Sequence, residues 1–184
     1  MIKKEFLKNI IINDICKSYL GGKMNESRVY AEYKYKKLLI DPNMRAHVDS
    51  PFKIIKVFLL LNDISIDNAP FSYYKKSHTF NQWRILKDLL EFSQVDKKYF
   101  SHYANYSDIE LRKILREYPE SISGRIDMTG KAGDVIITDN RGVHQGNILY
   151  DGYRLQLCLA YGPLGDFDIG NIPKHITNLV KNSK

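Results

Sequence analysis

The sequence predicts a mainly β fold with α insertions, in which two sheets form a double-stranded β-helix, or jelly roll. Segments with strand patterning occur in the first and last parts of the 184-residue chain. The intervening segment, about residues 80–119, carries apolar residues at helical spacing instead. The chain has no internal repeats and no low-complexity linkers. Strands, a helical insertion and further strands are typical of a double-sheet architecture.

An N-terminal helix is the first predicted element. Apolar residues recur at helical spacing from Phe6 to Tyr19, and Gly21 and Gly22 end the helix. Because one face of this helix is apolar, we expect it to pack on the outside of a sheet.

The predicted strands come from period-two alternation or from short runs of β-branched and aromatic residues. They cover residues 29–35, 53–61, 71–74, 125–128, 134–138 and 154–161. Within the helical insertion, Ser107 to Glu110 has the pattern of a helix start. We therefore expect residues 1–184 to form a single cupin-like domain with its core at about 28–162.

Composition agrees with one domain that has a sizeable core, since 43% of the residues are hydrophobic and 12% are aromatic. The formal net charge is +7. A lysine-rich solvated surface explains such a charge, and the same charge would also suit an anionic small-molecule substrate.

The sequence also predicts a cytoplasmic location. Cys16 and Cys158 do not make a disulfide framework, which favours a reducing compartment. Polar residues interrupt the apolar N-terminal stretch, which argues against a signal peptide. No apolar run approaches the roughly 18 to 20 residues of a membrane span, so we expect no membrane partner. The oligomeric state stays open.

Two short motifs carry the chemistry. In His47-Val48-Asp49, period-two alternation along a strand would put both side chains on one face. Much later in the chain, Gly142-Val143-His144-Gln145-Gly146 offers another imidazole. A His-x-Asp sequence alone is weak evidence, because a surface histidine beside a turn aspartate would give the same pattern. With His144 added, the residues match the two-His, one-carboxylate facial triad that holds Fe(II) and leaves positions open for a bidentate co-substrate and O2.

Arg154 follows the distal histidine and opens an apolar strand. Its guanidinium offers a fixed fork of donors that suits the far carboxylate of such a co-substrate. Gln156 and Cys158 share its face of the strand, so Gln156 is expected to line the same pocket. A surface position is the alternative for Arg154.

The joint pattern resembles the phytanoyl-CoA dioxygenase family over about residues 28–162. The matching text is His-Val-Asp at 47–49, Asp-Asn-Ala-Pro-Phe-Ser-Tyr-Tyr-Lys-Lys-Ser-His at 67–78, Ala-Gly-Asp-Val-Ile at 132–136, and His144 through Arg154. In the family the middle segment usually has Gly where this chain has Ala69, and Pro-Gly where it has Lys75 and Lys76. These departures leave the positions of the triad and of Arg154 intact.

The resemblance implies an Fe(II)- and 2-oxoglutarate-dependent dioxygenase that hydroxylates a small molecule, using O2 and converting 2-oxoglutarate to succinate. His47, Asp49 and His144 would be the catalytic metal ligands, and Arg154 would bind the C5 carboxylate of 2-oxoglutarate. A carboxylate at position 49 points to hydroxylation, because related halogenases have a small residue there.

The resemblance also suggests further residues near the co-substrate. The family often places an aromatic residue where this chain has Phe58, although core packing explains Phe58 as well. Some members use a hydroxyl residue two places after the distal histidine. Since that position here is Gly146, Arg154 would act with Thr138, with a tyrosine such as Tyr35, or with water.

Other functions remain open at this point. A non-catalytic cupin-like module could retain the triad for metal or ligand binding. A nucleic-acid dealkylating oxygenase is disfavoured, because such enzymes usually carry a second arginine where this chain has Ala160, and so no nucleic-acid partner is expected. A zinc site could use the same triad, but the carboxylate-binding Arg154 disfavours it.

Overall fold

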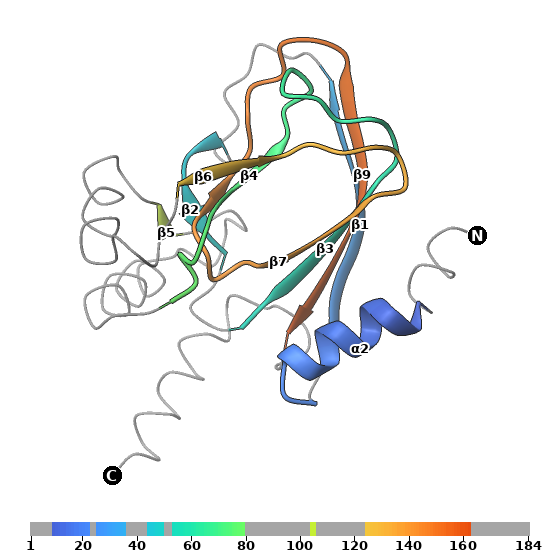
Figure 1. The fold of residues 1–184 in the computed structure, drawn as a ribbon, viewed down its shortest axis with the longest axis vertical. Helices are drawn as coiled ribbons and strands as arrows, with labels where there is room; N and C mark the ends of the chain where they lie inside the picture. Colours follow the sequence, from blue (N-terminus) through green and yellow to red (C-terminus); the bar gives the residue numbers. More distant parts are fainter. Residues whose placement is uncertain are drawn as a thin grey trace, which may run out of the picture.

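A computed structural model describes residues 9–22, 25–35, 44–49, 53–79, 104–105 and 124–162. These residues form two antiparallel sheets that enclose a buried interior (Figure 1). The four-stranded sheet has the order β1 (Asn25–Tyr35), β9 (Tyr153–Gly162), β3 (Ile55–Leu60) and β7 (Val135–Asp139). The five-stranded sheet has the order β5 (Ala104–Asn105), β2 (His47–Val48), β8 (His144–Gln145), β4 (Phe71–Tyr74) and β6 (Arg125–Met128). This arrangement confirms the predicted mainly β, jelly-roll fold.

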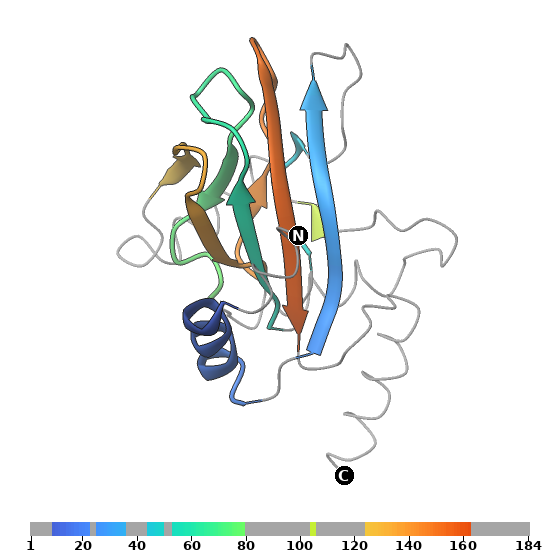
Figure 2. The ribbon, with the colours of Figure 1, turned by 90° about the vertical axis from the view of Figure 1, so that its right-hand side faces the viewer.

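The long strand β9 is the centre of the four-stranded sheet. It pairs with β1 along its whole length and with β3 on its other side, as Figure 2 shows. Arg154, Gln156 and Cys158 are buried at alternate positions of β9, as the period-two pattern predicted. Because β9 is paired on both sides, its backbone fixes where these polar side chains enter the interior.

Helix α2 (Ile10–Tyr19) covers the outer face of this sheet near one end (Figures 1 and 2). The side chain of Asn9 caps its first turn by accepting from the Ile12 amide at 3.1 Å. At the other end, Gly22 N donates to Lys17 O and Gly21 N donates to Ser18 O, with both glycines at positive φ. This is a Schellman motif, which requires the left-handed conformation that glycine adopts readily.

The helix buries a stripe of side chains against the outer positions of β3 and β9. The cluster consists of Ile12, Cys16, Leu20, Ile55, Val57, Leu159 and Tyr161. Packing of the helix on the outside of the sheet is thus confirmed. The predicted helix start at Phe6 lies outside the described residues.

Three elements differ from expectation. β1 begins at Asn25 rather than at residue 29, because pairing with β9 continues past an irregularity between Glu26 and Arg28. β2 contains only His47 and Val48, and Asp49 follows in a bend. The predicted helical insertion at 80–119 lies outside the described residues except for β5, which is a strand because it pairs with the edge of β2.

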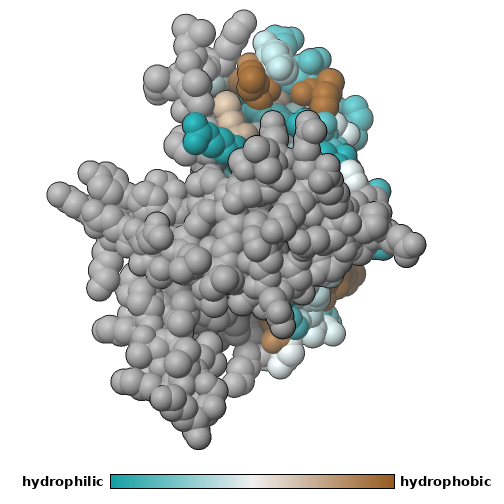
Figure 3. All heavy atoms as spheres, turned by 90° about the vertical axis from the view of Figure 1, so that its left-hand side faces the viewer, coloured by the Kyte–Doolittle hydropathy of each residue, from teal (hydrophilic) through white to brown (hydrophobic). Residues whose placement is uncertain are grey.

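The described surface is mixed in polarity. In the view of Figure 3, brown apolar spheres lie among teal polar ones on the coloured part of the surface. Within the described parts of the chain, no helix is long and apolar enough to cross a membrane. The compartment remains a prediction from the sequence.

Candidate metal centre

The predicted triad comes together at the centre of the five-stranded sheet. His47 on β2 lies directly opposite His144 on β8 in the strand register, and Asp49 follows β2 in the chain. One ligand atom from each of the three residues lies within 4.8 Å of the others. The three side chains are buried, with relative exposures of 4% for His47, 6% for Asp49 and 2% for His144. The described residues therefore contain a compact His–Asp–His cluster shielded from solvent.

Backbone carbonyls orient both imidazoles. His47 Nδ1 lies 2.6 Å from Arg45 O, and His144 Nδ1 lies 2.8 Å from Gly142 O. Because a carbonyl oxygen only accepts, each Nδ1 carries the proton and donates it, so each Nε2 presents a lone pair. On His144 this lone pair also accepts from Asn140 Nδ2 at 3.2 Å. These Nε2 atoms lie 3.9 Å and 3.4 Å from Asp49 Oδ1. Such hydrogen bonds from the far ring nitrogen are what fixes metal-ligating histidines in other proteins.

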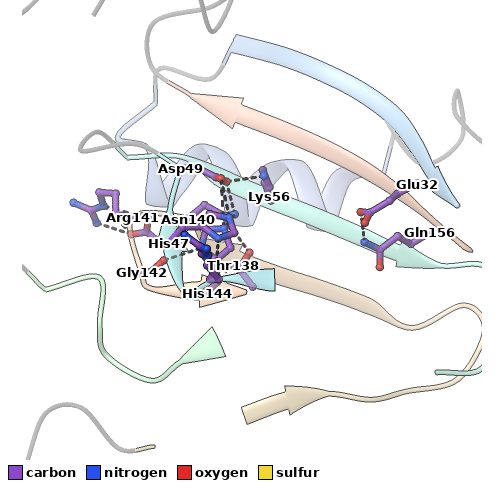
Figure 4. Close-up of polar contacts among 12 residues, drawn as sticks. Glu32, His47, Asp49, Lys56, Thr138, Asn140, Arg141, Gly142, His144 and Gln156 are labelled. Atoms are coloured by element: carbon purple, nitrogen blue, oxygen red, sulfur yellow. Dashed lines mark hydrogen bonds and ion pairs between the residues drawn. The ribbon is translucent and has the colours of Figure 1, made fainter. Parts of the chain in front are cut away.

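The carboxylate of Asp49 is held on one oxygen only. Its Oδ2 accepts from Asn140 Nδ2 at 2.6 Å and forms an ion pair with Lys56 Nζ at 2.6 Å (Figure 4). Its Oδ1 is buried and has no hydrogen-bond partner among the described residues. A buried, unpaired carboxylate oxygen is costly. This oxygen lies near two imidazole lone pairs, which is a donor set that a divalent metal ion would satisfy.

The electrostatics favour the protonation states that a metal ion needs. Burial, followed by the neighbouring His144, lowers the pKa of His47 to about 4, so the ring is neutral at physiological pH. Burial alone would raise the pKa of Asp49, but Lys56 and the adjacent His144 outweigh it and hold the pKa well below its usual range. Metal ligands must be deprotonated in this way.

Arg154 lies at the other end of the same cavity, which has a volume of about 340 Å³. Arg154 is only 4% exposed. Its guanidinium donates through Nη1 to Ala69 O and through Nη2 to Glu32 on β1, while its buried Nε has no hydrogen-bond partner among the described residues. Gln156 donates to the second oxygen of Glu32 at 2.8 Å (Figure 4).

Of the further residues predicted near the co-substrate, some line this cavity and others do not. Phe58 and Gln156 line the cavity together with the triad and Arg154. Phe58 contacts Phe71, with ring centroids 5.0 Å apart, and Phe71 in turn lies 5.3 Å from the His144 ring.

Thr138 is placed elsewhere. Its hydroxyl donates to Asn140 Oδ1 at 2.6 Å, and it is absent from the described lining of this cavity. Tyr35, the other residue considered beside Arg154, is 51% exposed.

Residues that sequence reasoning did not select complete the site. Asn140 and Lys56 both hold Asp49, and Glu32 holds Arg154. Lys56 alternates with the core residues Ile55 and Val57 on β3, whereas Glu32 alternates with exposed residues on β1. This period-two alternation was the available signal that both face inward. Asn140 directly follows the strand before His144, a position that by itself does not identify a partner.

Comparisons with known proteins agree with the fold. The chain resembles the solved structures of the non-heme alpha-ketoglutarate-dependent carbocyclase SnoK (21% identity, TM-score 0.52, 82% of this chain and 54% of that chain), of the epimerase SnoN from nogalamycin biosynthesis in complex with Fe3+, alpha-ketoglutarate and nogalamycin RO (15%, 0.55, 82% and 54%), and of EctD from S. alaskensis with 2-oxoglutarate and 5-hydroxyectoine (16%, 0.53, 81% and 48%). The chain thus spans about half the length of these structures. At these identities the likeness establishes the jelly-roll fold.

No family model matches the chain, and no curated protein matches it significantly.

Proposed function

We propose that this protein is an Fe(II)- and 2-oxoglutarate-dependent dioxygenase of the phytanoyl-CoA dioxygenase-like type, which hydroxylates a small molecule. The observation that carries the proposal is the pairing of two groups in one cavity. A buried His47–Asp49–His144 cluster, in which one carboxylate oxygen has no hydrogen-bond partner within the described ranges, lies at one end, and a buried arginine lies at the other. A metal-chelating dicarboxylate needs both groups.

Neighbouring structures support this choice of metal and co-substrate. The SnoN complex contains Fe3+ and alpha-ketoglutarate, and one EctD complex contains 2-oxoglutarate. Both proteins share the fold of this chain, and each complex also contains a small molecule, nogalamycin RO in SnoN and 5-hydroxyectoine in EctD. The donor set of this chain fits the same ion, since imidazole and carboxylate suit Fe(II).

The chain's own residues would divide the work as follows. His47 and His144 would hold the metal through Nε2, and Asp49 would hold it through Oδ1. Asn140 and Lys56 keep Oδ2 occupied, which favours one-oxygen ligation by Asp49. When bound, the iron and its co-substrate would supply oxidation of a C–H bond by O2, coupled to decarboxylation of 2-oxoglutarate to succinate.

The remaining cavity residues would position the co-substrate and exclude water. Phe58 and Phe71 form an apolar wall beside the His144 ring. Arg154, with Gln156 close by, would bind the distal carboxylate through charge-assisted hydrogen bonds. Lys34 also lines the cavity, so an anionic substrate would meet a favourable charge.

Anaerobic reconstitution tests the proposal. Fe(II) and 2-oxoglutarate are added without O2, the visible metal-to-ligand charge-transfer band is recorded, and O2 is then admitted while succinate is measured. We expect a band followed by succinate, and both should be lost in Asp49→Ala. Asp63→Ala is the matched control, because Asp63 is an exposed carboxylate paired with Lys131 on the surface.

Two results would count against the proposal. Unchanged turnover in Asp49→Ala would remove Asp49 from the metal site. Bound iron with neither band nor succinate would favour the alternative, a non-catalytic metal- or ligand-binding module that retains the triad.

A further inference from the structure

Arg154 already binds a carboxylate of its own chain. Its Nη2 donates to Glu32 Oε1, and Gln156 holds Glu32 Oε2 at 2.8 Å. In the strand register Glu32 lies directly opposite Gln156. The pair formed by Lys34 and Arg154 follows two residues along on the same face of the sheet. Glu32 therefore occupies the group to which the co-substrate's distal carboxylate is proposed to bind.

The contact between Glu32 and Arg154 uses only part of the guanidinium. A carboxylate that binds side-on would take both Nε and Nη2. In the structure Nη2 donates to Glu32, whereas Nε is buried and has no hydrogen-bond partner in the parts of the chain that the structure describes. A bidentate ligand would satisfy this buried donor, and Glu32 leaves it unsatisfied.

The two partners also differ in their freedom to move. Arg154 is 5% exposed on its side chain and is fixed by its second bond to Ala69 O, whereas the Glu32 side chain is 36% exposed. Glu32 can thus turn toward solvent and regain hydration, while Arg154 stays in place. Displacement of Glu32 by another carboxylate needs no rearrangement of the sheet.

We propose that Glu32 is an internal competitor for Arg154, so that a dicarboxylate co-substrate binds Arg154 only after Glu32 has moved away. This inference rests on the proposed function, and it means that Glu32 determines how tightly the co-substrate binds. When Arg154 is open in only a fraction of the molecules, the apparent affinity for the ligand is reduced by that fraction. Removing the charge of Glu32 should therefore tighten binding of 2-oxoglutarate.

The test measures binding rather than turnover. The Fe(II) protein is titrated without O2 with 2-oxoglutarate, using the charge-transfer band, and also with 2-oxovalerate, which chelates equally but has a methyl group instead of the distal carboxylate. In Glu32→Gln we expect the Kd for 2-oxoglutarate to fall about tenfold. The Kd for 2-oxovalerate should stay within a factor of about two, because this ligand never reaches Arg154.

Two further variants control the result. Asp63→Asn changes the net charge by the same amount on the exposed surface and should leave both constants unchanged. Glu32→Asp keeps the charge on a side chain one methylene shorter and should give an intermediate gain, which preserves the test if Glu32→Gln fails to fold. Unaltered binding of 2-oxovalerate also shows that a variant retains its metal site.

Failure of this inference can be told apart from failure of the proposed function. If the unaltered protein binds 2-oxoglutarate and Glu32→Gln binds it no more tightly, competition by Glu32 is excluded while the oxygenase assignment stands. Equal tightening of both ligands would also overturn the inference, since the effect would not pass through Arg154. If neither protein gives a band with 2-oxoglutarate, the proposed function fails and the inference fails with it.

Discussion

His47 and His144 lie directly opposite each other on the antiparallel strands β2 and β8, with ring centroids 4.4 Å apart. Both side chains must point to the same face of the sheet for the Nε2 atoms to converge near Asp49. A shift of one residue in this register would turn one imidazole to the other face. The geometry of the cluster therefore depends on features that fix the two short strands.

Gly142 is one such feature, and we predict that Gly142→Ala damages the metal centre. A Cβ at this position would overlap the ring of Tyr73, whose hydroxyl donates to Asp139 O at 2.9 Å. Since Gly142 O also orients His144, relief of this overlap should displace the imidazole. Overpacking of this kind costs about 1–3 kcal/mol. Urea unfolding and iron retention after gel filtration would measure both effects.

Gly133→Ala is a useful comparison for Gly142→Ala. Gly133 has a φ of 97° but no atom within 4 Å of an added Cβ. The Gly133→Ala substitution should lower the stability of the fold through backbone strain and leave iron retention intact. Equal loss of iron in both variants would mean that the overlap with Tyr73 is not the cause.

Asn140→Ala should weaken metal binding although Asn140 is not a proposed ligand. Its amide holds Asp49 Oδ2, and its backbone carbonyl accepts from the Asp49 amide at 3.1 Å. Loss of a side chain that orients a metal ligand typically costs about 10–100-fold in affinity. Competition with a chromophoric chelator would report the change. Thr138→Val should have a much smaller effect, since the Thr138 hydroxyl donates to the amide oxygen of Asn140 and not to Asp49. Equal losses would contradict a direct role for Asn140.

Arg154→Ala should raise the apparent KM for 2-oxoglutarate strongly, because a lost buried charge pair is worth on the order of 2–5 kcal/mol. Arg154→Lys keeps the positive charge but lacks the planar set of donors of a guanidinium, so it should restore only part of the lost affinity for 2-oxoglutarate. Steady-state succinate formation would give both values. An unchanged KM would remove Arg154 from co-substrate binding.

The two cysteines should be unreactive in the folded protein. Burial raises the pKa of both Cys16 and Cys158 from 9.0 to about 11, so the thiolate fraction at pH 8 is about one in a thousand. Alkylation by iodoacetamide should be slow in buffer and fast in urea. Because the folded pKa is the higher one, this contribution to stability is complete below pH 9 and is lost as the pH rises toward 11. Rapid alkylation of the native protein at pH 8 would contradict this prediction.

The sequence predicted the fold class and most strands, because alternation along a strand reports directly which side chains are buried. It singled out His47, Asp49, His144 and Arg154 as candidate site residues because few chemistries need these residue types in that order, and the structure places all four around one cavity. It did not identify Lys56 or Glu32, since their roles follow from the pairing of β3, β9 and β1, which side-chain alternation does not specify.

The position of Thr138 shows the same limit in another form. Because Gly146 lacks the hydroxyl that some members of the family have at that position, Thr138 was predicted to act beside Arg154 instead. The strand β7 instead directs the Thr138 hydroxyl to Asn140, which holds Asp49, and Thr138 is not among the described residues that line the cavity with Arg154. Distance along the chain says little about which end of a barrel a side chain reaches.

The ion pair between Lys56 and Asp49 has a consequence for the order of assembly. A lone buried carboxylate would oppose folding until an ion arrived, as in small zinc modules that are unfolded without their metal. Here the lysine supplies the compensating charge from within the chain. Folding could therefore be completed before any metal is acquired, and an ion would enter a site that is already formed.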